Sequence, residues 1–202
     1  MLGLLAAAAA IVTAVDAERA FFVDAQAQGQ WTAFRKWAAE DAVLFTPLPK
    51  NAQEFLAGRK DPAVAVVWWP GENYVSCDGQ LAVNTGPWVR EAGKSVGYFT
   101  TVWRRGAKDW RWVYDAGDAL KEPRALPDQP KVRKASCEGR PWGANVLGTA
   151  AMLGYRSGGG RSNDGTLVWS WASGPKGDRR FLAQLWNGRA FETVVEDVVA
   201  AK

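Results

Sequence analysis

The clearest alternation of large apolar and polar residues lies between residues 96 and 118, and it is typical of a long β-hairpin. β-Branched and aromatic residues run up to Arg105, break over residues 106–109, and resume at Trp110. A four-residue break that contains glycine, placed between two such runs, is a strand–turn–strand signal. The sequence therefore predicts two paired strands in this stretch.

The predicted hairpin has two different faces. If Arg105 pairs with Trp110, strict alternation of side chains sorts the residues of both strands. One face is aromatic: Phe99, Trp103, Trp110, Trp112 and Tyr114. The other face is narrower and mixed: Tyr98, Thr100, Val102, Val113 and Asp115. Because both faces carry apolar residues, we expect both to be covered.

The residues before this hairpin predict helices followed by strands. Helical periodicity is expected over residues 13–28, 31–40 and 52–57, with Asn51 capping the third helix through an Asx-x-x-Glu pattern. Strands are expected over residues 42–46, 64–69, 72–77 and 80–91. Asp78-Gly79 between the last two is a tight-turn signal.

The residues after the hairpin have a different composition. Residues 120–134 are rich in proline and charge and are predicted to be a linker. Residues 135–202 begin with a glycine-rich segment, after which three antiparallel strands are expected over residues 166–171, 179–186 and 190–199. The sequence shows no evident internal repeat.

Composition limits the partners of the chain. The 202 residues are 48% apolar, include 12 Trp and carry a net charge of +4. The basic residues form only short clusters, so a nucleic acid is not an expected partner. Twelve Trp favour a large aromatic core or an aromatic cavity.

The chain contains no histidine. This absence excludes Ser-His-Asp and Cys-His catalysis, His-ligated metals and an imidazole base. Acid–base chemistry would have to use Asp, Glu, Tyr or Lys. We expect neither a metal site nor a cofactor.

The N-terminus and the two cysteines bear on the compartment. Residues 1–10 begin an apolar, alanine-rich run that resembles a secretory signal and could extend to residue 17, although it lacks a charged start. It is too short for a membrane span. The alternative is an alanine-rich first helix of the mature domain. Cys77 and Cys137 either form one disulfide in an exported protein, periplasmic or secreted, or remain two thiols in the cytoplasm.

Three groups of residues resemble the nuclear transport factor 2-like superfamily, in particular small uncharacterised bacterial members of its SnoaL-like branch. They are Gly-Gln-Trp-x-x-Phe and Glu-Asp-Ala-Val-x-Phe within residues 29–45, Asp-Gly-x-Leu-Ala-Val at residues 78–83, and the hairpin Gly-Tyr-Phe-x-x-Val-Trp-Arg with Trp-Arg-Trp-Val-Tyr-Asp. The resemblance covers residues 11–119 and leaves residues 135–202 unexplained.

This resemblance implies an α+β fold, in which a cone-shaped, curved antiparallel sheet packs on N-terminal helices. A C-terminal antiparallel β extension would follow it in this chain. The cone of the superfamily commonly opens onto an apolar pocket. Its members include isomerases, cyclases and hydrolases as well as binding and assembly modules, so the fold does not decide the function.

The resemblance also suggests where a site would lie. In a ketosteroid-isomerase-like arrangement, one carboxylate moves a proton while a tyrosine or a neutral acid stabilises the oxyanion. Asp115 and Tyr98, on the mixed face, are the candidate catalytic pair, and Asp41 and Asp118 are reserves. Thr100, Val102, Val113 and Trp68 are the candidate ligand-binding residues. The structural alternatives are a strand-end carboxylate for Asp115 and a core tyrosine for Tyr98.

Three functions remain open on the sequence alone. The first is an exported domain that holds a small apolar ligand without catalysis. The second is an isomerase, cyclase or hydrolase that uses Asp115 and Tyr98 for proton transfer. The third is a dimerising or scaffolding module, in which an aromatic sheet face forms a homodimer interface and residues 135–202 cover that face or bind a partner.

Overall fold

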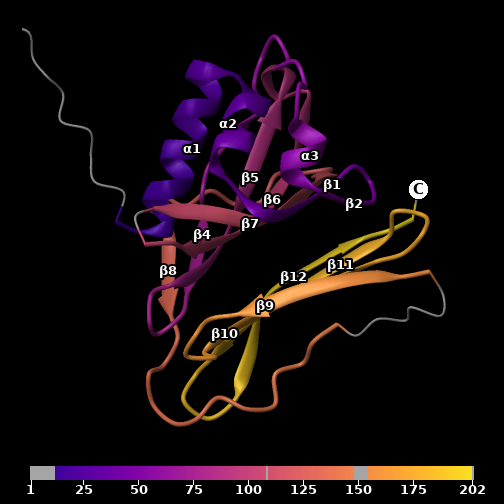
Figure 1. The fold of residues 1–202 in the computed structure, drawn as a ribbon. Coiled ribbons are helices and arrows are strands. Elements are labelled where there is room, and N and C mark those ends of the chain that lie inside the picture. The colour runs from indigo at the N-terminus through magenta and orange to yellow at the C-terminus, as the bar shows by residue number, and fades with distance from the viewer. Residues whose placement is uncertain (1–11, 108, 148–153, 202) are drawn as a thin grey trace, which may run out of the picture.

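The chain folds into three layers, with helices on a large curved sheet and a smaller sheet beneath it (Figure 1). The computed structural model describes residues 12–107, 109–147 and 154–201. The signal-like residues 1–10 lie outside the described residues. No helix among the described residues is both long and apolar enough to span a bilayer.

Helices α1 (Ala14–Gln28), α2 (Gln30–Trp37) and α3 (Ala52–Leu56) form the first layer. Thr13 and Asp16 cap α1 reciprocally. Gly29 separates α1 from α2 with φ of 106°, and a Cβ there would lie 2.4 Å from the Asp61 carboxyl group. Asp61 in turn accepts hydrogen bonds from the first turn of α2. Because α1 begins at Ala14, a cut after residue 17 would remove its first turn, including the completely buried Ala17.

Sheet A is the middle layer and contains the hairpin predicted between residues 96 and 118. Its strands are β1 (Ala38–Phe45), β2 (Pro49–Asn51), β3 (Val67–Trp68), β4 (Glu72–Val75), β5 (Leu81–Arg90), β6 (Ser95–Arg105), β7 (Trp110–Leu120) and β8 (Lys131–Lys134). A short 3-10 helix, η1 (Glu91–Gly93), joins β5 to β6. The order is β2-β1-β7-β6-β5-β4-β8, with β3 beside β5. The sheet is mixed, because the pairs β1–β7 and β4–β8 are parallel.

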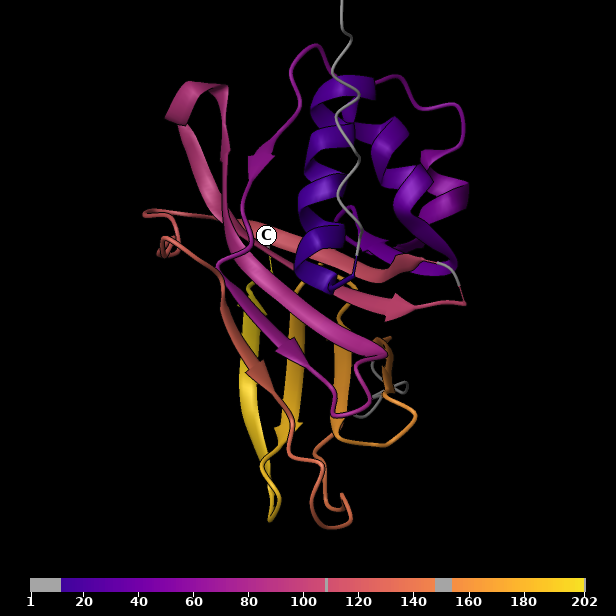
Figure 2. The same cartoon turned by 90° about the vertical axis from the view of Figure 1, so that its left-hand side faces the viewer.

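Sheet B is the third layer and is built from the C-terminal residues. Its strands are β9 (Arg156–Arg161), β10 (Leu167–Ser173), β11 (Arg179–Trp186) and β12 (Phe191–Val199), in the order β12-β11-β10-β9. Figure 2 shows its upright strands behind the diagonal strands of sheet A. The predicted α+β class with a C-terminal β extension is confirmed.

Two details of the C-terminal half differ from the sequence prediction. Residues 131–134 are not a free linker, since they form edge strand β8 of sheet A. Sheet B has a fourth strand, β9. It was not predicted because its run of glycines resembles a loop. A Cβ on Gly158 would lie 2.8 Å from the Trp171 ring, and one on Gly160 would lie 3.0 Å from the Trp169 ring. Glycine is therefore present for packing and does not mark a loop here.

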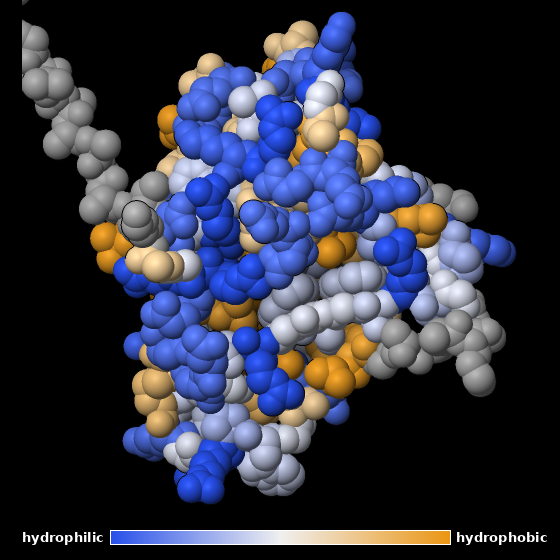
Figure 3. Space-filling view, viewed as in Figure 1, coloured by the Kyte–Doolittle hydropathy of each residue, from blue (hydrophilic) through white to orange (hydrophobic). Residues whose placement is uncertain are grey.

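Both faces of sheet A are covered, as the hairpin pattern predicted. The helices cover one face, where Phe21 lies against Trp68 and Trp103. Sheet B covers the other face, where the Tyr114 and Phe181 rings stack with their centroids 4.6 Å apart. Figure 3 shows mainly hydrophilic residues over the helices and hydrophobic residues where the two halves meet.

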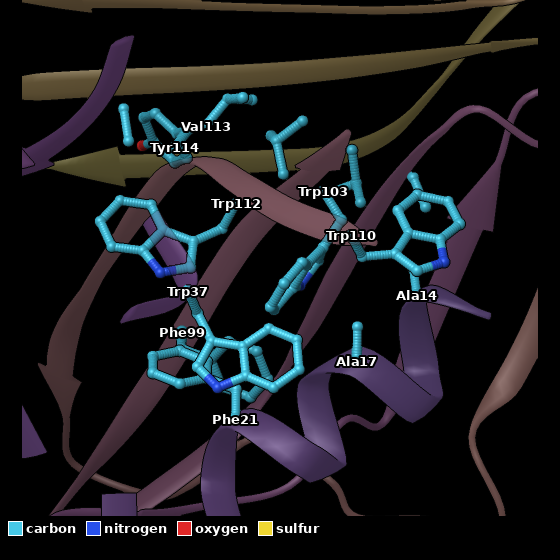
Figure 4. Packing of buried hydrophobic residues seen from close by; sticks show 14 of the residues in the cluster. Ala14, Ala17, Phe21, Trp37, Phe99, Trp103, Trp110, Trp112, Val113 and Tyr114 are labelled. Carbon is cyan, nitrogen blue, oxygen red and sulfur yellow. The ribbon is translucent and has the colours of Figure 1, made fainter. Parts of the chain in front are cut away.

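The predicted pairing of the hairpin is right at its tip and wrong beyond it. Trp103 pairs with Trp112, as predicted, but the register then shifts and Val102 pairs with Tyr114. Val113 is the extra residue of a β-bulge, which reverses the face of every later residue of β7. Asp115 therefore pairs with Thr101 instead of Thr100. Figure 4 shows Trp112 on the helix side and Tyr114 toward the C-terminal strands.

Cys77 and Cys137 form a disulfide. Cys77 lies in the turn between β4 and β5, and Cys137 lies just after β8. The bond therefore ties sheet A to the start of the C-terminal half.

Candidate functional site

A cavity of about 380 Å³ lies between the helices and the inner face of sheet A. Eight aromatic side chains line it: Phe21, Trp31, Phe34, Phe45, Phe55, Trp68, Trp88 and Phe99. They come from all three helices and from four strands of the sheet. The volume falls within the usual range for small-molecule pockets.

Asp115 places a carboxylate in this aromatic wall. Its position follows from the bulge at Val113, which turns Asp115 toward the helices. The Thr101 hydroxyl donates a hydrogen bond of 2.8 Å to its Oδ2. Burial raises the Asp115 pKa to about 6, although this hydrogen bond and the positive charge of Arg179 act in the opposite direction. The group can therefore gain or lose a proton close to neutral pH.

Arg90, Ser95 and Asp118 also line the cavity. The Arg90 guanidinium lies 4.8 Å from the centre of the Trp88 ring. On the helix side, Gln30 Oε1 accepts a hydrogen bond of 3.0 Å from the backbone N–H of Val66. This bond holds the chain before β3 against α2, so the wall is fixed by hydrogen bonds as well as by packing.

Glu18 is a second buried carboxylate that the sequence analysis missed. It lies on α1 with no exposed surface and accepts three hydrogen bonds, from the indoles of Trp68 (2.9 Å) and Trp103 (2.6 Å) and from the Asn84 amide (3.1 Å). Burial raises its pKa to about 7 despite these donors, and the nearby Asp115 charge adds to the increase. Its spacing from Ala14 and Phe21, both on the buried face of α1, was the available signal.

Tyr98 does not join Asp115. It precedes Phe99, which lines the cavity, so alternation along β6 directs Tyr98 to the opposite face of sheet A. There its ring lies 4.0 Å from the Arg124 guanidinium. Burial raises the Tyr98 pKa to about 12, with a contribution from the Asp197 charge. The predicted pair of Asp115 and Tyr98 on one face is therefore wrong, because the bulge moved Asp115 and not Tyr98.

Only one of the four predicted ligand-binding residues lies in the cavity wall. Trp68 lines the cavity, whereas Thr100, Val102 and Val113 are not among its lining residues. Thr100 instead donates a hydrogen bond of 2.7 Å to Asp197 of sheet B. Val102 and Val113 are buried.

The reserve carboxylates also occupy different places. Asp118 lies in the cavity wall. Asp41 forms an exposed ion pair with Arg104, whose hydrogen bonds lower the Asp41 pKa. Among the described residues, no three His, Cys, Asp or Glu side chains come together as a metal site would need.

Residues 14–120 place helices on a curved sheet, which is the arrangement that the resemblance to nuclear transport factor 2-like proteins implied. No family model matches the chain, and no curated protein matches its sequence.

Solved structures of similar fold include proteins of unknown function. A nuclear transport factor 2-like protein from Pseudomonas putida is 16% identical, covers 57% of this chain and 95% of its own, and has a TM-score of 0.38. One from Shewanella oneidensis is 19% identical, covers 46% and 87%, and has a TM-score of 0.39. A member of the DUF3225 family from Pectobacterium atrosepticum is 12% identical, covers 53% and 88%, and has a TM-score of 0.40. These likenesses concern the fold alone.

Proposed function

We propose that this protein binds a small, largely apolar molecule in the cavity between the helices and sheet A, with Asp115 as its polar anchor. The presence of the Asp115 carboxylate in a cavity lined by eight aromatic side chains carries the proposal. Aromatic walls supply apolar contact area, and a few fixed polar groups orient the ligand. Because its pKa is about 6, Asp115 is mostly ionised at neutral pH and accepts a hydrogen bond from a hydroxyl or amine of the ligand.

A pair of probes tests both parts of this proposal. We expect 1-naphthol to bind and change the fluorescence of the wall tryptophans, and we expect naphthalene to bind more weakly. A hydrogen bond to a charged acceptor is worth roughly 1 kcal/mol more than one to a neutral acceptor. Asp115→Asn should therefore weaken 1-naphthol binding about fivefold and leave naphthalene binding unchanged.

The control is Asp41→Asn, which removes the same charge from an exposed ion pair outside the cavity wall. It should alter the binding of neither probe. If both probes fail to bind the parent protein, or if Asp41→Asn acts like Asp115→Asn, the cavity does not have this function.

Proton transfer is a second candidate function, and the raised pKa of Asp115 favours it. A buried carboxylate with a pKa near neutral suits a general base. Asp115 would take the proton from the carbon between the carbonyl and the double bond of a β,γ-unsaturated ketone, and would return it to the γ-carbon. The product is the conjugated ketone, and no other reactant is needed.

The ultraviolet absorbance of the conjugated product measures this activity with 3-cyclohexenone. The expected result is a rate above that of buffer, lost in Asp115→Asn and falling as pH decreases through about 6, since the protonated acid cannot act as the base. Tyr98 lies on the other face and cannot assist, so Tyr98→Phe should leave the rate unchanged. A parent rate equal to that of buffer would leave binding as the function.

We also propose that the protein works in an oxidising compartment after export. The disulfide between Cys77 and Cys137 supports this proposal, because such bonds persist mainly outside the cytosol. Mass spectrometry of the natively expressed protein would measure the free thiols and the first residue. Free thiols together with a retained N-terminal run would contradict export.

A further inference from the structure

The strands of sheet B repeat those of sheet A, although the sequence shows no evident repeat. Strands β4, β5, β6 and β7 form a meander in which each strand pairs with the next, and β9, β10, β11 and β12 form another. The register agrees as well as the order. Leu81, which opens β5, pairs with Arg104 two residues before the next turn, and Leu167, which opens β10, pairs with Leu185 in the same position.

The first turn of each meander has the same sequence pattern and the same hydrogen bonds. Residues 76–81 and 162–167 both read Ser-x-Asp-Gly-x-Leu. In each turn the Ser hydroxyl donates to the Asp Oδ1 over 2.5 Å, and the Ser backbone N–H donates to the Leu carbonyl over 2.9 Å. The Asp Oδ1 also accepts the N–H of the residue after glycine, at 2.9 Å in one turn and 3.0 Å in the other.

The last hairpin of each meander agrees in the same detail. Gly106 donates its backbone N–H to the carbonyl of Asp109 before β7, and Asn187 donates its backbone N–H to the carbonyl of Ala190 before β12. The strand that follows has a β-bulge at its fourth residue in both cases, at Val113 in β7 and at Val194 in β12. β-Bulges are specific features of the backbone, so a bulge at the same strand position supports the equivalence of the two meanders.

The two copies contact each other reciprocally. Asp78 donates its backbone N–H to Asp164 Oδ2 over 2.7 Å, and Asp164 donates its backbone N–H to Asp78 Oδ2 over 3.3 Å. Each aspartate thus holds its own turn with one oxygen and the other turn with the second oxygen. A contact in which each residue meets its own counterpart is the pattern of a two-fold, isologous interface between subunits.

The second meander covers the outer face of sheet A, which is the face opposite the helices. Tyr114 stacks on Phe181, and Thr100 bonds to Asp197. Asp197 is almost completely buried and forms an ion pair with Arg124, from the segment that connects β7 to β8. Removing one partner of such a pair leaves an uncompensated charge, so the contact is specific as well as apolar.

Each copy is covered differently on its other face. In sheet A, Asn84 and Trp103 hold helix α1 through Glu18. The positions that correspond in sheet B are Ser170 and Gln184, and they hold the backbone of residues 145–147 through hydrogen bonds of 3.0 and 2.7 Å. The second copy thus keeps the meander and replaces the helical cover with an extended segment.

We infer that strands β9–β12 are a second copy of the β4–β7 meander and serve as an internal partner for the outer face of sheet A. That face fits a four-stranded meander of its own kind, and the chain supplies one from its C-terminal half. The protein is therefore monomeric, and residues 135–202 replace the second subunit that the sequence left open as a homodimer. This inference is independent of what the cavity binds.

Sedimentation equilibrium of the full chain with an intact disulfide tests the inference. The expected result is a single species of 22.0 kDa at all concentrations for the native chain. Phe181→Arg places a charge between the sheets and uncovers the outer face of sheet A, which should then pair with a second chain and double the mass. Leu182→Arg makes the same change on the opposite face of β11 and should remain monomeric. A native dimer, or a folded Phe181→Arg monomer, would overturn the inference.

A second pair of variants decides the matter if Phe181→Arg fails to fold. Asp78→Asn and Asp164→Asn each keep the oxygen that holds their own turn and place an amide donor against the N–H of the other turn. Because each turn donates one hydrogen bond to the aspartate of the other turn, both variants should lower the urea midpoint, and the double variant should add little. A decrease in only one of them would show that the turns are not two-fold related.

Discussion

Glu18 shows at the residue scale how burial outweighs hydrogen bonding. Three donors converge on its carboxylate, and each lowers its pKa, yet the absence of any exposed surface raises the pKa to about 7. The side chain joins α1 to β3, β5 and β6 through single hydrogen bonds. Glu18 therefore holds α1 on sheet A beside the cavity. Its ionisation near neutral pH lowers the stability of the folded protein.

Replacing this carboxyl group should change the pH dependence of stability. The folded protein holds the Glu18 proton more tightly than the unfolded chain, whose value is near 4.5, so the stabilisation is complete below 4.5 and is lost as pH rises through about 7. Between pH 5 and pH 8 we expect the free energy of unfolding to fall by about 2–3 kcal/mol more in the parent than in Glu18→Gln. Urea denaturation across this range measures the difference, and parallel curves would contradict it.

The sequence identified Asp115 and misidentified its surroundings. The residue types of the hairpin were enough to single out its carboxylate among apolar strand residues. Its neighbours depended on strict alternation, which the extra residue Val113 interrupts. Nothing in the composition around Val113 marks a bulge. Asp115 therefore lines the cavity with Trp68 and Phe99, and Tyr98 lies against sheet B.

At the scale of elements, patterning predicted those strands and helices that carry large side chains. The Asn51 cap, the Asp78-Gly79 turn and strands β10, β11 and β12 appear where periodicity and turn residues placed them. β9 was missed because three of its six residues are glycines. The large side chains that pack there belong to the neighbouring strand β10. Gly158 and Gly160 leave room for the rings of Trp171 and Trp169.

A single methyl group in β9 tests this account. Alanine normally stabilises a strand relative to glycine, by about 0.5–1 kcal/mol. At Gly158 the added Cβ would lie 2.8 Å from the Trp171 ring, which is itself packed against Phe45. We therefore expect Gly158→Ala to lower the free energy of unfolding by about 1–2 kcal/mol. Guanidinium denaturation measures this loss.

Two further variants separate packing from propensity. Ser157→Ala, one residue earlier in the same strand, should change stability by less than about 0.5 kcal/mol. Trp171→Phe should cost less in the Gly158→Ala background than in the parent, since the smaller ring leaves space for the methyl group. A Gly158→Ala variant more stable than the parent would contradict the role given to the glycine.

At the scale of the molecule, the sequence predicted the first two layers and not their relation to the third. The resemblance described residues 11–119, and it implied helices on a curved sheet with an apolar pocket. The C-terminal half repeats the meander of sheet A in backbone pairing and turns, while its side chains differ almost throughout. Phe181 and Leu182 occupy the positions of Thr100 and Thr101, for example. Pairing register is a property of the backbone, so comparison of side chains alone does not reveal it.

The disulfide between Cys77 and Cys137 joins the two halves beside the contact of the Asp78 and Asp164 turns, and its loss should weaken the whole molecule. It closes a loop that spans 60 residues of sequence separation. The loss of chain entropy in the unfolded state is then worth about 4 kcal/mol, a large part of the 5–15 kcal/mol typical of a domain. Reduction should lower the guanidinium midpoint of the parent to that of Cys77→Ser/Cys137→Ser. The same reductant should leave the double variant unchanged, and 1-naphthol binding should persist in both, since the cavity belongs to the helices and sheet A. A parent protein whose midpoint is unaffected after its thiols are shown to be free would disprove this role of the bond.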